Sequence, residues 1–299
     1  MLPYAIESVL AQERRDFELF VICDGAPPET AEIARSYAVN DPRIQVFEHP
    51  KGERHGEAYR DHALRRARGE FICQIGDDDL WFPNHLEEIA KLLDHCDFGH
   101  LPQLEVAPNG MMKIAPGDLA DASLRQRMLT ERFNFFGPTV AGYRIEAYRA
   151  LSVGWSPAPP DLPTDLFMWR KFLAQDGLRF ATRFALTSVK FVAAARRNWP
   201  LEQRRREVAT WSARLSNDVD RDLIAQSALC SLSQSAHENR ARISALESRL
   251  RQADAKLAAM AQQSDKLSRK LGKMRWSWSW RLTRPFRKVA RRIGRLGLG

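Results

Sequence analysis

The sequence contains no hydrophobic run of about 18 residues, which excludes a helix long enough to cross a bilayer. Its N-terminal segment carries acidic residues early and has no basic start before an apolar stretch, unlike a secretory signal. Cysteine is scarce and forms no CxxC pair. The four cysteines are Cys23, Cys73, Cys96 and Cys230. These features favour a cytoplasmic protein with reduced thiols over a disulfide or zinc framework.

Excess positive charge is absent from the first two thirds of the chain, although the net charge is +9. Residues 1–200 contain 24 basic residues (Lys or Arg) and 28 acidic residues (Asp or Glu). Residues 201–299 contain 22 basic and 9 acidic residues. Eight basic and no acidic residues follow residue 274. The chain is therefore expected to have a mildly acidic body and a basic tail, and any attraction to an anionic surface belongs to the tail.

Helical and strand patterns alternate through the first hundred residues. Helical spacing occurs over 3–12, 27–40, 56–69 and 83–96, and apolar strand patterns over 16–25, 43–49 and 70–76. This alternation predicts a parallel sheet with helices on both faces. Right-handed crossovers would align the three strands, so CDG (23–25) and GDDD (76–79) would meet at the edge where such sheets bind ligands. Residues 97–200 are assigned to the second half of the same domain, 1–200.

After Pro200, proline is absent until Pro285 and glycine until Gly272. Residues 201–228 are predicted to be a helical connector, and a 3–4 repeat then continues to residue 274. The repeat positions are Leu229, Leu232, Ala236, Asn239, Ile243, Leu246, Leu250, Ala253, Leu257, Met260, Ser264, Leu267, Leu271 and Met274. Ten of these fourteen are Leu, Ile or Met, which predicts a long α-helical coiled coil over 229–274 and association with further copies. The alternative is one amphipathic helix folded onto the domain.

The last segment, 275–299, combines three tryptophans with clustered arginine. Its apolar positions follow steps of four and three at Leu282, Phe286, Val289, Ile293 and Leu296. A helix with this pattern can lie in a membrane interface. The alternatives are a solvated basic tail or a segment that packs on a partner. No base-reading module precedes the tail, so nucleic acid is not expected as a partner.

Three adjacent aspartates, Asp77, Asp78 and Asp79, follow the predicted strand at 70–76. Mg²⁺ and Mn²⁺ prefer hard oxygen ligands, and a cation here would lower the mutual repulsion of the carboxylates. It would also neutralise a diphosphate leaving group. Since no GxGxxG follows a strand and no GxxxxGK[ST] occurs, a bound nucleotide would need the metal to hold its phosphates. The alternative is an acidic turn at the start of the helix at 83. His85, close by, is expected on the surface of that helix.

The ordered run AIESVLAQ, DFELFVICDGAPPET and RRARGEFICQIGDDDLWFPNHLEEI resembles the nucleotide-binding half of family 2 glycosyltransferases. The resemblance is close over residues 3–95, weaker over 96–200 and absent over 201–299. It implies the A-type glycosyltransferase fold, which is Rossmann-like with a mostly parallel sheet. It also implies transfer of a sugar from a UDP-, GDP- or dTDP-sugar to a glycan or lipid-linked acceptor, with inversion at the anomeric carbon.

The resemblance also implies roles for individual residues. Asp24 would accept a hydrogen bond from the nucleotide base, and Asp77 would lie near the ribose or base. Asp78 would bind Mn²⁺ or Mg²⁺, with Asp79 in its shell. Arg60 would lie near the nucleotide, or else form a surface ion pair. Asp165 is implied to be the general base, and the alternative is an ordinary residue at a helix N-terminus.

Two features depart from the family pattern. The family has two acids where this chain has Cys23 followed by Asp24. Its first strand is also missing here, which implies a misassigned start or a truncated chain. The main hypothesis is a metal-dependent glycosyltransferase of surface polysaccharide assembly, located at the inner face of the membrane. The second is a non-catalytic protein whose coiled coil and tail act in assembly or docking. Nucleotidyl transfer is weaker, because those enzymes use a glycine-rich first loop.

Overall fold

The computed structural model describes residues 1–287 and divides the chain into two compact units, Met1–Ser233 and Gln234–Gly299. Part of the predicted tail helix, including Val289, Ile293 and Leu296, lies outside the described residues. Among the helices that the structure describes, none combines the length and the apolar character that crossing a membrane requires.

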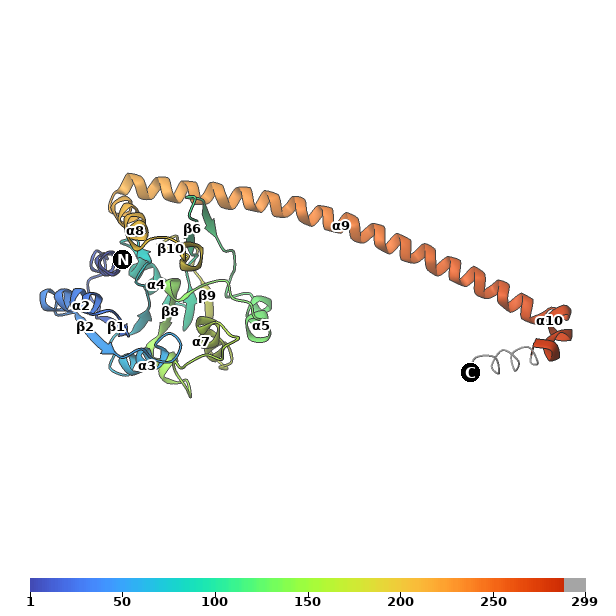
Figure 1. The fold of residues 1–299 in the computed structure, drawn as a ribbon, viewed down its shortest axis with the longest axis horizontal. Helices are drawn as coiled ribbons and strands as arrows, with labels where there is room; N and C mark the ends of the chain where they lie inside the picture. Colours follow the sequence, from blue (N-terminus) through green and yellow to red (C-terminus); the bar gives the residue numbers. More distant parts are fainter. Residues whose placement is uncertain (288–299) are drawn as a thin grey trace. The chain divides into compact units, whose positions relative to one another are not determined.

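The first unit begins with an alternation of helix and strand, as the sequence predicts. The elements are α1 (Leu2–Leu10), β1 (Leu19–Asp24), α2 (Pro28–Asn40), β2 (Ile44–His49) and α3 (Glu57–Leu64). Strands β1 and β2 are parallel, and Asp24 at the end of β1 lies opposite His49 at the end of β2. Residues Val21 and Cys23 of β1 bury their side chains with Ala34 of α2 and Ile6 of α1. These elements lie together in Figure 1, where they are coloured blue.

The central sheet has the order β3-β8-β5-β9. Its strands are β3 (Phe71–Cys73), β8 (Ala141–Arg144), β5 (Phe98–His100) and β9 (Phe180–Thr182). Strand β8 is antiparallel to both β3 and β5, whereas β5 and β9 are parallel. The pairings are therefore mixed, and β3 does not share a sheet with β1 and β2 as the simple alternation predicts. The loops after β1 and β3 start from separate sheets.

Helices cover both faces of the central sheet because its residues alternate in direction. On one face, Gly99 of β5 and Gly142 of β8 are paired, and an added Cβ would collide with Leu92 and Ile89 of α4 (His85–Leu93). These glycines let α4 approach closely. On the other face, the ring of Phe98 lies 4.8 Å from that of Phe172 in α7 (Thr164–Leu173).

A third sheet has the order β4-β10-β6-β7. Its strands are β4 (Leu80–Trp81), β10 (Ser188–Phe191), β6 (Leu104–Val106) and β7 (Met112–Ile114). Helix α8 (Leu201–Leu215) buries Val208, Trp211 and Leu215 with this sheet, and α9 (Asp218–Trp276) adds Ile224 and Ala228. The compact unit therefore includes α8 and the first turns of α9, which the sequence analysis assigned to a connector.

Shorter elements complete the described chain: α5 (Ala122–Thr130), the 3₁₀ turns η1 (Pro138–Val140) and η2 (Ala193–Arg196), α6 (Ile145–Arg149) and α10 (Trp278–Leu282). The predicted α/β class, with a long helix after the domain, is confirmed.

The expectation that His85 lies on a helix surface is wrong. Its side chain is fully buried, and its ring stacks on that of Trp81 with 4.2 Å between centroids. Burial lowers the pKa of His85 to about 3, so the ring is neutral in the folded protein. Sequence spacing missed this because Thr187, which forms a hydrogen bond with the ring, is 102 residues away along the chain.

Candidate active site

Asp24 lies at the carboxyl end of β1, where the loop 50–56 closes over it. The backbone N–H of Gly52 donates to Asp24 Oδ1 over 2.6 Å, and the Lys51 ammonium forms an ion pair with Oδ2. Burial alone would raise the pKa of Asp24, but the hydrogen bonds from Lys51 and Gly52 outweigh it and hold the pKa below its usual value. Asp24 is therefore an ionised acceptor at neutral pH.

Three glycines leave room for the Asp24 side chain. Gly25 and Gly56 have φ angles of +65° and +72°, a region that glycine adopts readily. A Cβ on Gly56 would lie 2.9 Å from Asp24 Cβ, and one on Gly25 would lie 2.7 Å from Lys51 Cβ. A Cβ on Gly52 would lie 2.7 Å from the ring of Tyr59. The loop can close over Asp24 only because these positions lack side chains.

Helix α3 connects the Asp24 loop to the start of α7. Glu57, at its first position, is fully buried and accepts hydrogen bonds from His55 N over 2.9 Å and from Thr164 Oγ1 over 2.7 Å. One turn later, the Arg60 guanidinium lies 4.9 Å from the ring centroid of Trp155. Burial lowers the pKa of Arg60, while Glu57, Asp24 and Asp165 act in the opposite direction. Arg60 is thus a partly buried cation near both aspartates and not the surface ion pair of the alternative.

Asp165 lies in the first turn of α7. Its Oδ1 accepts from Leu166 N over 2.8 Å, and its Oδ2 accepts from Asn134 Nδ2 over 2.9 Å. The residue that caps this helix is Pro163, and no side chain caps the helix by a hydrogen bond. Burial raises the pKa of Asp165, although Leu166 N–H, Lys190 and Asn134 oppose that rise. A carboxylate with a raised pKa is a stronger base than one in water.

Asp77 and Asp78 occupy the loop between β3 and β4. Asp77 is exposed, whereas Asp78 is partly buried and forms an ion pair with Arg204 of α8, with 2.9 Å between Oδ2 and Nη2. Burial and the nearby Asp77 raise the pKa of Asp78, and Arg204 opposes that rise. The repulsion between adjacent carboxylates is therefore offset here by an arginine 126 residues away along the chain.

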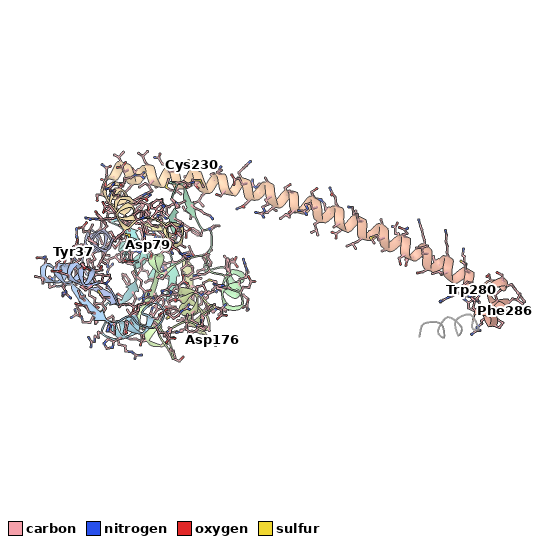
Figure 2. The ribbon with its side chains drawn as sticks, viewed as in Figure 1. Tyr37, Asp79, Asp176, Cys230, Trp280 and Phe286 are labelled. Atoms are coloured by element: carbon pink, nitrogen blue, oxygen red, sulfur yellow. The ribbon has the colours of Figure 1, made fainter. Side chains whose placement is uncertain are left out.

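Asp79, labelled in Figure 2, is buried within the first unit. It is 4% exposed, accepts a hydrogen bond from Thr139 Oγ1, and accepts a second from Phe191 N over 3.3 Å. Burial raises its pKa to about 7, while Thr139 and the Lys190 ammonium act in the opposite direction. Its contacts join the aspartate loop to η1 and β10.

Two cations connect these carboxylates. Arg60 is close enough to Asp24 and Asp165 for both to affect its pKa. Lys190, in β10, is close enough to Asp79 and Asp165 to oppose the rise in the pKa of each. Asp24 and Asp165 therefore have Arg60 as a common neighbour, and Asp79 and Asp165 have Lys190 as a common neighbour. Asp77 is set apart from them by its exposure.

The donor set suits a cation that takes most of its ligands from a substrate. No group of three His, Cys, Asp or Glu side chains within residues 1–287 is arranged to hold a metal ion. Asp78 remains partly accessible next to exposed Asp77, and one or two carboxylates with substrate phosphates are the usual environment of Mg²⁺. Asp79 faces inward, where it can support the loop from behind. The residues fit a metal of this kind.

A surface depression of about 390 Å³ lies elsewhere in the first unit. Its lining includes Ser152, Phe167 and Lys171 and none of the predicted aspartates. No carboxylate lines it, so we do not assign the chemistry to it.

Several residues with polar roles at this site were not predicted. Arg204, Lys190, Lys51, Glu57 and Thr139 each contact or affect one of the predicted carboxylates or its loop. Only Glu57 has a sequence signal, an acid in the first turn of a helix after glycine. The others become neighbours only through the packing of distant segments.

Comparison with known proteins identifies a family model that matches residues 1–152, described as glycosyl transferase family 2. The chain is 33% identical over 185 residues to "Putative glycosyltransferase EpsE" of Bacillus subtilis strain 168, covering 60% of this chain and 63% of EpsE. It is 38% identical over 84 residues to "Putative colanic acid biosynthesis glycosyl transferase WcaA" of Escherichia coli K12, covering 27% of this chain and 29% of WcaA. The chain spans 13% to 63% of the length of the first three curated relatives.

Among solved structures, TarS residues 1–349 from S. aureus has a TM-score of 0.52 at 18% identity, covering 70% of this chain and 60% of that one. The complex of the same TarS fragment with UDP-GlcNAc has a TM-score of 0.51 at 18% identity, and the match covers 64% of this chain and 54% of that chain. At this identity, the likeness shows the fold alone.

The substitution Gly56→Ala tests the packing around Asp24. It introduces a strained φ angle and a collision with Asp24, so we expect a loss of at least about 2 kcal/mol in the free energy of unfolding. Gly177→Ala is the matched control, because Gly177 has φ +82° and open space around it. The control should cost about 1 kcal/mol from strain alone. Equal losses in urea unfolding would show that Asp24 is not confined by Gly56.

Proposed function

Since this chain belongs to the glycosyl transferase family 2, we propose that its first unit transfers a sugar from a nucleotide-sugar to an acceptor hydroxyl with the help of a divalent cation. The observation that carries the proposal is that Arg60 lies near Asp24 and Asp165, while Lys190 lies near Asp165 and near Asp79, the neighbour of Asp78. We assign Asp24 to the nucleotide base, Asp78 to the metal, Asp79 to the support of the metal-binding loop, and Asp165 to proton transfer.

The nucleotide contacts are assigned to the end of β1 and to α3. Asp24, held ionised by Lys51 and Gly52, accepts a hydrogen bond from the base. Exposed Asp77 lies near the ribose or base, and Arg60 places positive charge beside the nucleotide. The donor is a UDP-, GDP- or dTDP-sugar. The UDP-GlcNAc complex of TarS, which shares the fold, supports a uridine donor as the first to test.

The metal is assigned to Asp78, with Asp79 supporting the loop from inside. A bound Mn²⁺ or Mg²⁺ would neutralise the diphosphate as it leaves. Before the donor arrives, Arg204 balances the charge of Asp78. In this proposal Arg204 transfers its contact from Asp78 to the diphosphate, and Asp78 becomes free for the cation.

Asp165 is assigned as the general base. Its position in the first turn of α7 is fixed by Asn134 and Leu166 N–H, and burial keeps its pKa above the usual value. It would accept the proton of the acceptor hydroxyl as that oxygen attacks the anomeric carbon, with inversion. The acceptor is a glycan or lipid-linked sugar of surface polysaccharide assembly, which the name of WcaA as a colanic acid enzyme supports.

The substitution Asp78→Asn tests the metal assignment. Loss of the charge should lower transfer by about 100-fold or more, because metal stabilisation of a leaving phosphate contributes several kcal/mol. It should also remove the increase in melting temperature that UDP and Mn²⁺ together give the native chain, without unfolding it.

Asp176→Asn, an exposed residue of the same unit shown in Figure 2, is the matched control and should behave like the native chain. Retained transfer in Asp78→Asn would exclude the metal role. A native chain that neither transfers sugar nor shifts its melting with UDP, GDP or dTDP would support the non-catalytic hypothesis instead.

The pH dependence of transfer tests Asp165. A base acts only when deprotonated, and the pKa of Asp165 is raised, so kcat/KM should fall as the pH drops through a value above the ordinary 3.8. Asp165→Asn should lower kcat by about 10²- to 10⁴-fold and abolish this acidic limb. Donor-induced melting shifts should persist in the variant. An unchanged acidic limb would assign the base elsewhere.

The tail 275–299 is proposed to contact an anionic membrane surface, at the inner face of the cell membrane. Among its described residues, Trp276, Trp278 and Phe286 are 77%, 82% and 75% exposed. The Arg287 guanidinium lies 3.7 Å from the ring centroid of Trp280. Exposed aromatic rings beside arginines suit the boundary between headgroups and acyl chains.

Vesicle co-sedimentation tests this contact with the full chain. Binding should be stronger to vesicles containing phosphatidylserine than to pure phosphatidylcholine, and it should weaken as salt rises. Trp276→Ser with Trp278→Ser should reduce binding to both vesicle types by removing apolar contact. Equal binding to both vesicle types by the native chain would remove the electrostatic part of the proposal.

A further inference from the structure

Helix α9 carries a long apolar face that is exposed in the single chain. Within the second unit, every large apolar residue of the seam from Ile243 to Met274 has more than half of its surface exposed. These residues are Ile243, Leu246, Leu250, Leu257, Met260, Leu267, Leu271 and Met274. An isolated helix gains little stability from such a face, since most helix stability in proteins comes from packing it. A partner helix that packs against this face would supply that stability.

The spacing of the seam identifies the geometry of that partner. Its fourteen positions, Leu229 to Met274, alternate steps of three and four without interruption. A strict seven-residue repeat packs as a left-handed coiled coil, with the first and fourth positions of each heptad, a and d, at the centre. Counting from Leu229 as a, Ala236, Ile243 and Leu250 are further a positions, and Asn239 and Leu246 are d positions.

The charges that flank the seam decide the direction of the partner. The g positions, which precede each a, are basic at four places: Arg242, Arg249, Lys256 and Lys270. The e positions, which follow each d, are acidic at Glu247 and Asp254. In a parallel pair, each g residue faces the e residue five positions later on the other helix. Arg242 then faces Glu247 of the second copy, and Arg249 faces its Asp254.

An antiparallel pair places g against g and e against e. Aligned end to end, it would bring Arg249 next to Lys256 and Glu247 next to Asp254, which are like charges. The polar seam positions do not distinguish the two directions, because Asn239 would face Ser264 in the antiparallel pair. One parallel contact, Lys270 with Arg275, is also of like charge, but it lies at the end of the seam. The central charges favour the parallel direction.

We propose that residues 234–276 pair with the same segment of a second copy of this chain as a parallel, in-register, two-stranded coiled coil. The proposal does not depend on sugar transfer. Symmetry doubles each favourable contact, so Arg242–Glu247 and Arg249–Asp254 each occur twice in the dimer. Both copies of Gln234 then lie at one end of the coil and both copies of Trp276 at the other.

Cysteine cross-linking in the full chain tests direction and register. In a Cys230→Ser background, Ala236→Cys places a thiol at an a position, and Ala241→Cys places one on the outer face. Mild oxidation should link the first variant into a dimer of twice the 34.2 kDa chain mass and leave the second unlinked. In an antiparallel pair aligned end to end, the two thiols at 236 would lie far apart. Absence of a link in Ala236→Cys, or equal links in both variants, would overturn the proposal.

Charge reversal tests the pairing separately. Glu247→Lys with Asp254→Lys turns the four attractions of the dimer into repulsions, so the dissociation constant in sedimentation should rise about 10-fold or more at low salt. The matched control, Glu238→Lys with Asp265→Lys, makes the same charge change on the outer face. It should alter the dissociation constant by less than about 2-fold. Adding Arg242→Glu and Arg249→Glu to the first variant should restore the dimer. Equal weakening by the two double variants, or a monomeric native chain, would contradict the proposal.

Discussion

Carboxylates that leave water need a compensating group, and this requirement governs how the first unit is built around its acidic residues. Asp24 is balanced by Lys51 next to it in space, and Asp78 by Arg204 from α8. Among residues 1–287, no cation contacts Asp79 directly, and Asp79 instead accepts hydrogen bonds from Thr139 and Phe191 N, with a pKa raised to about 7. The group that compensates each aspartate comes from a different part of the chain. The aspartates therefore reach their final environments only when the whole unit has folded.

This dependence explains why α8 belongs to the compact unit. Its apolar side chains Val208, Trp211 and Leu215 cover the third sheet, and the same helix delivers Arg204 to Asp78. Packing and charge balance therefore act together at this helix. Buried Glu57 has a comparable role, because its hydrogen bonds with His55 N and Thr164 connect the Asp24 loop to the start of α7.

Elements with a clear apolar period could be predicted from the sequence. Elements and contacts that depend on pairing between distant segments could not. The helices through α4 and the strands β1 and β2 were found from apolar spacing, because each is long enough to show its period. Strands of two or three residues, such as β4, β5 and β9, carry no readable period and acquire their form from cross-strand partners. The aspartates were found because three adjacent acids are unusual, whereas Arg204 and Lys190 look like ordinary surface cations. The burial of His85 likewise depends on Thr187, which is remote in sequence.

The narrow space around Asp24 has a consequence for redesign of this chain. Because Gly25, Gly52 and Gly56 are each within collision distance of a neighbouring residue, a library that varies them would mostly return misfolded proteins. Lys51 reaches Asp24 with the end of a flexible and largely exposed side chain, so its replacement disturbs the ion pair with little change in volume. Efforts to change the surroundings of Asp24 should therefore diversify position 51 and leave the three glycines untouched.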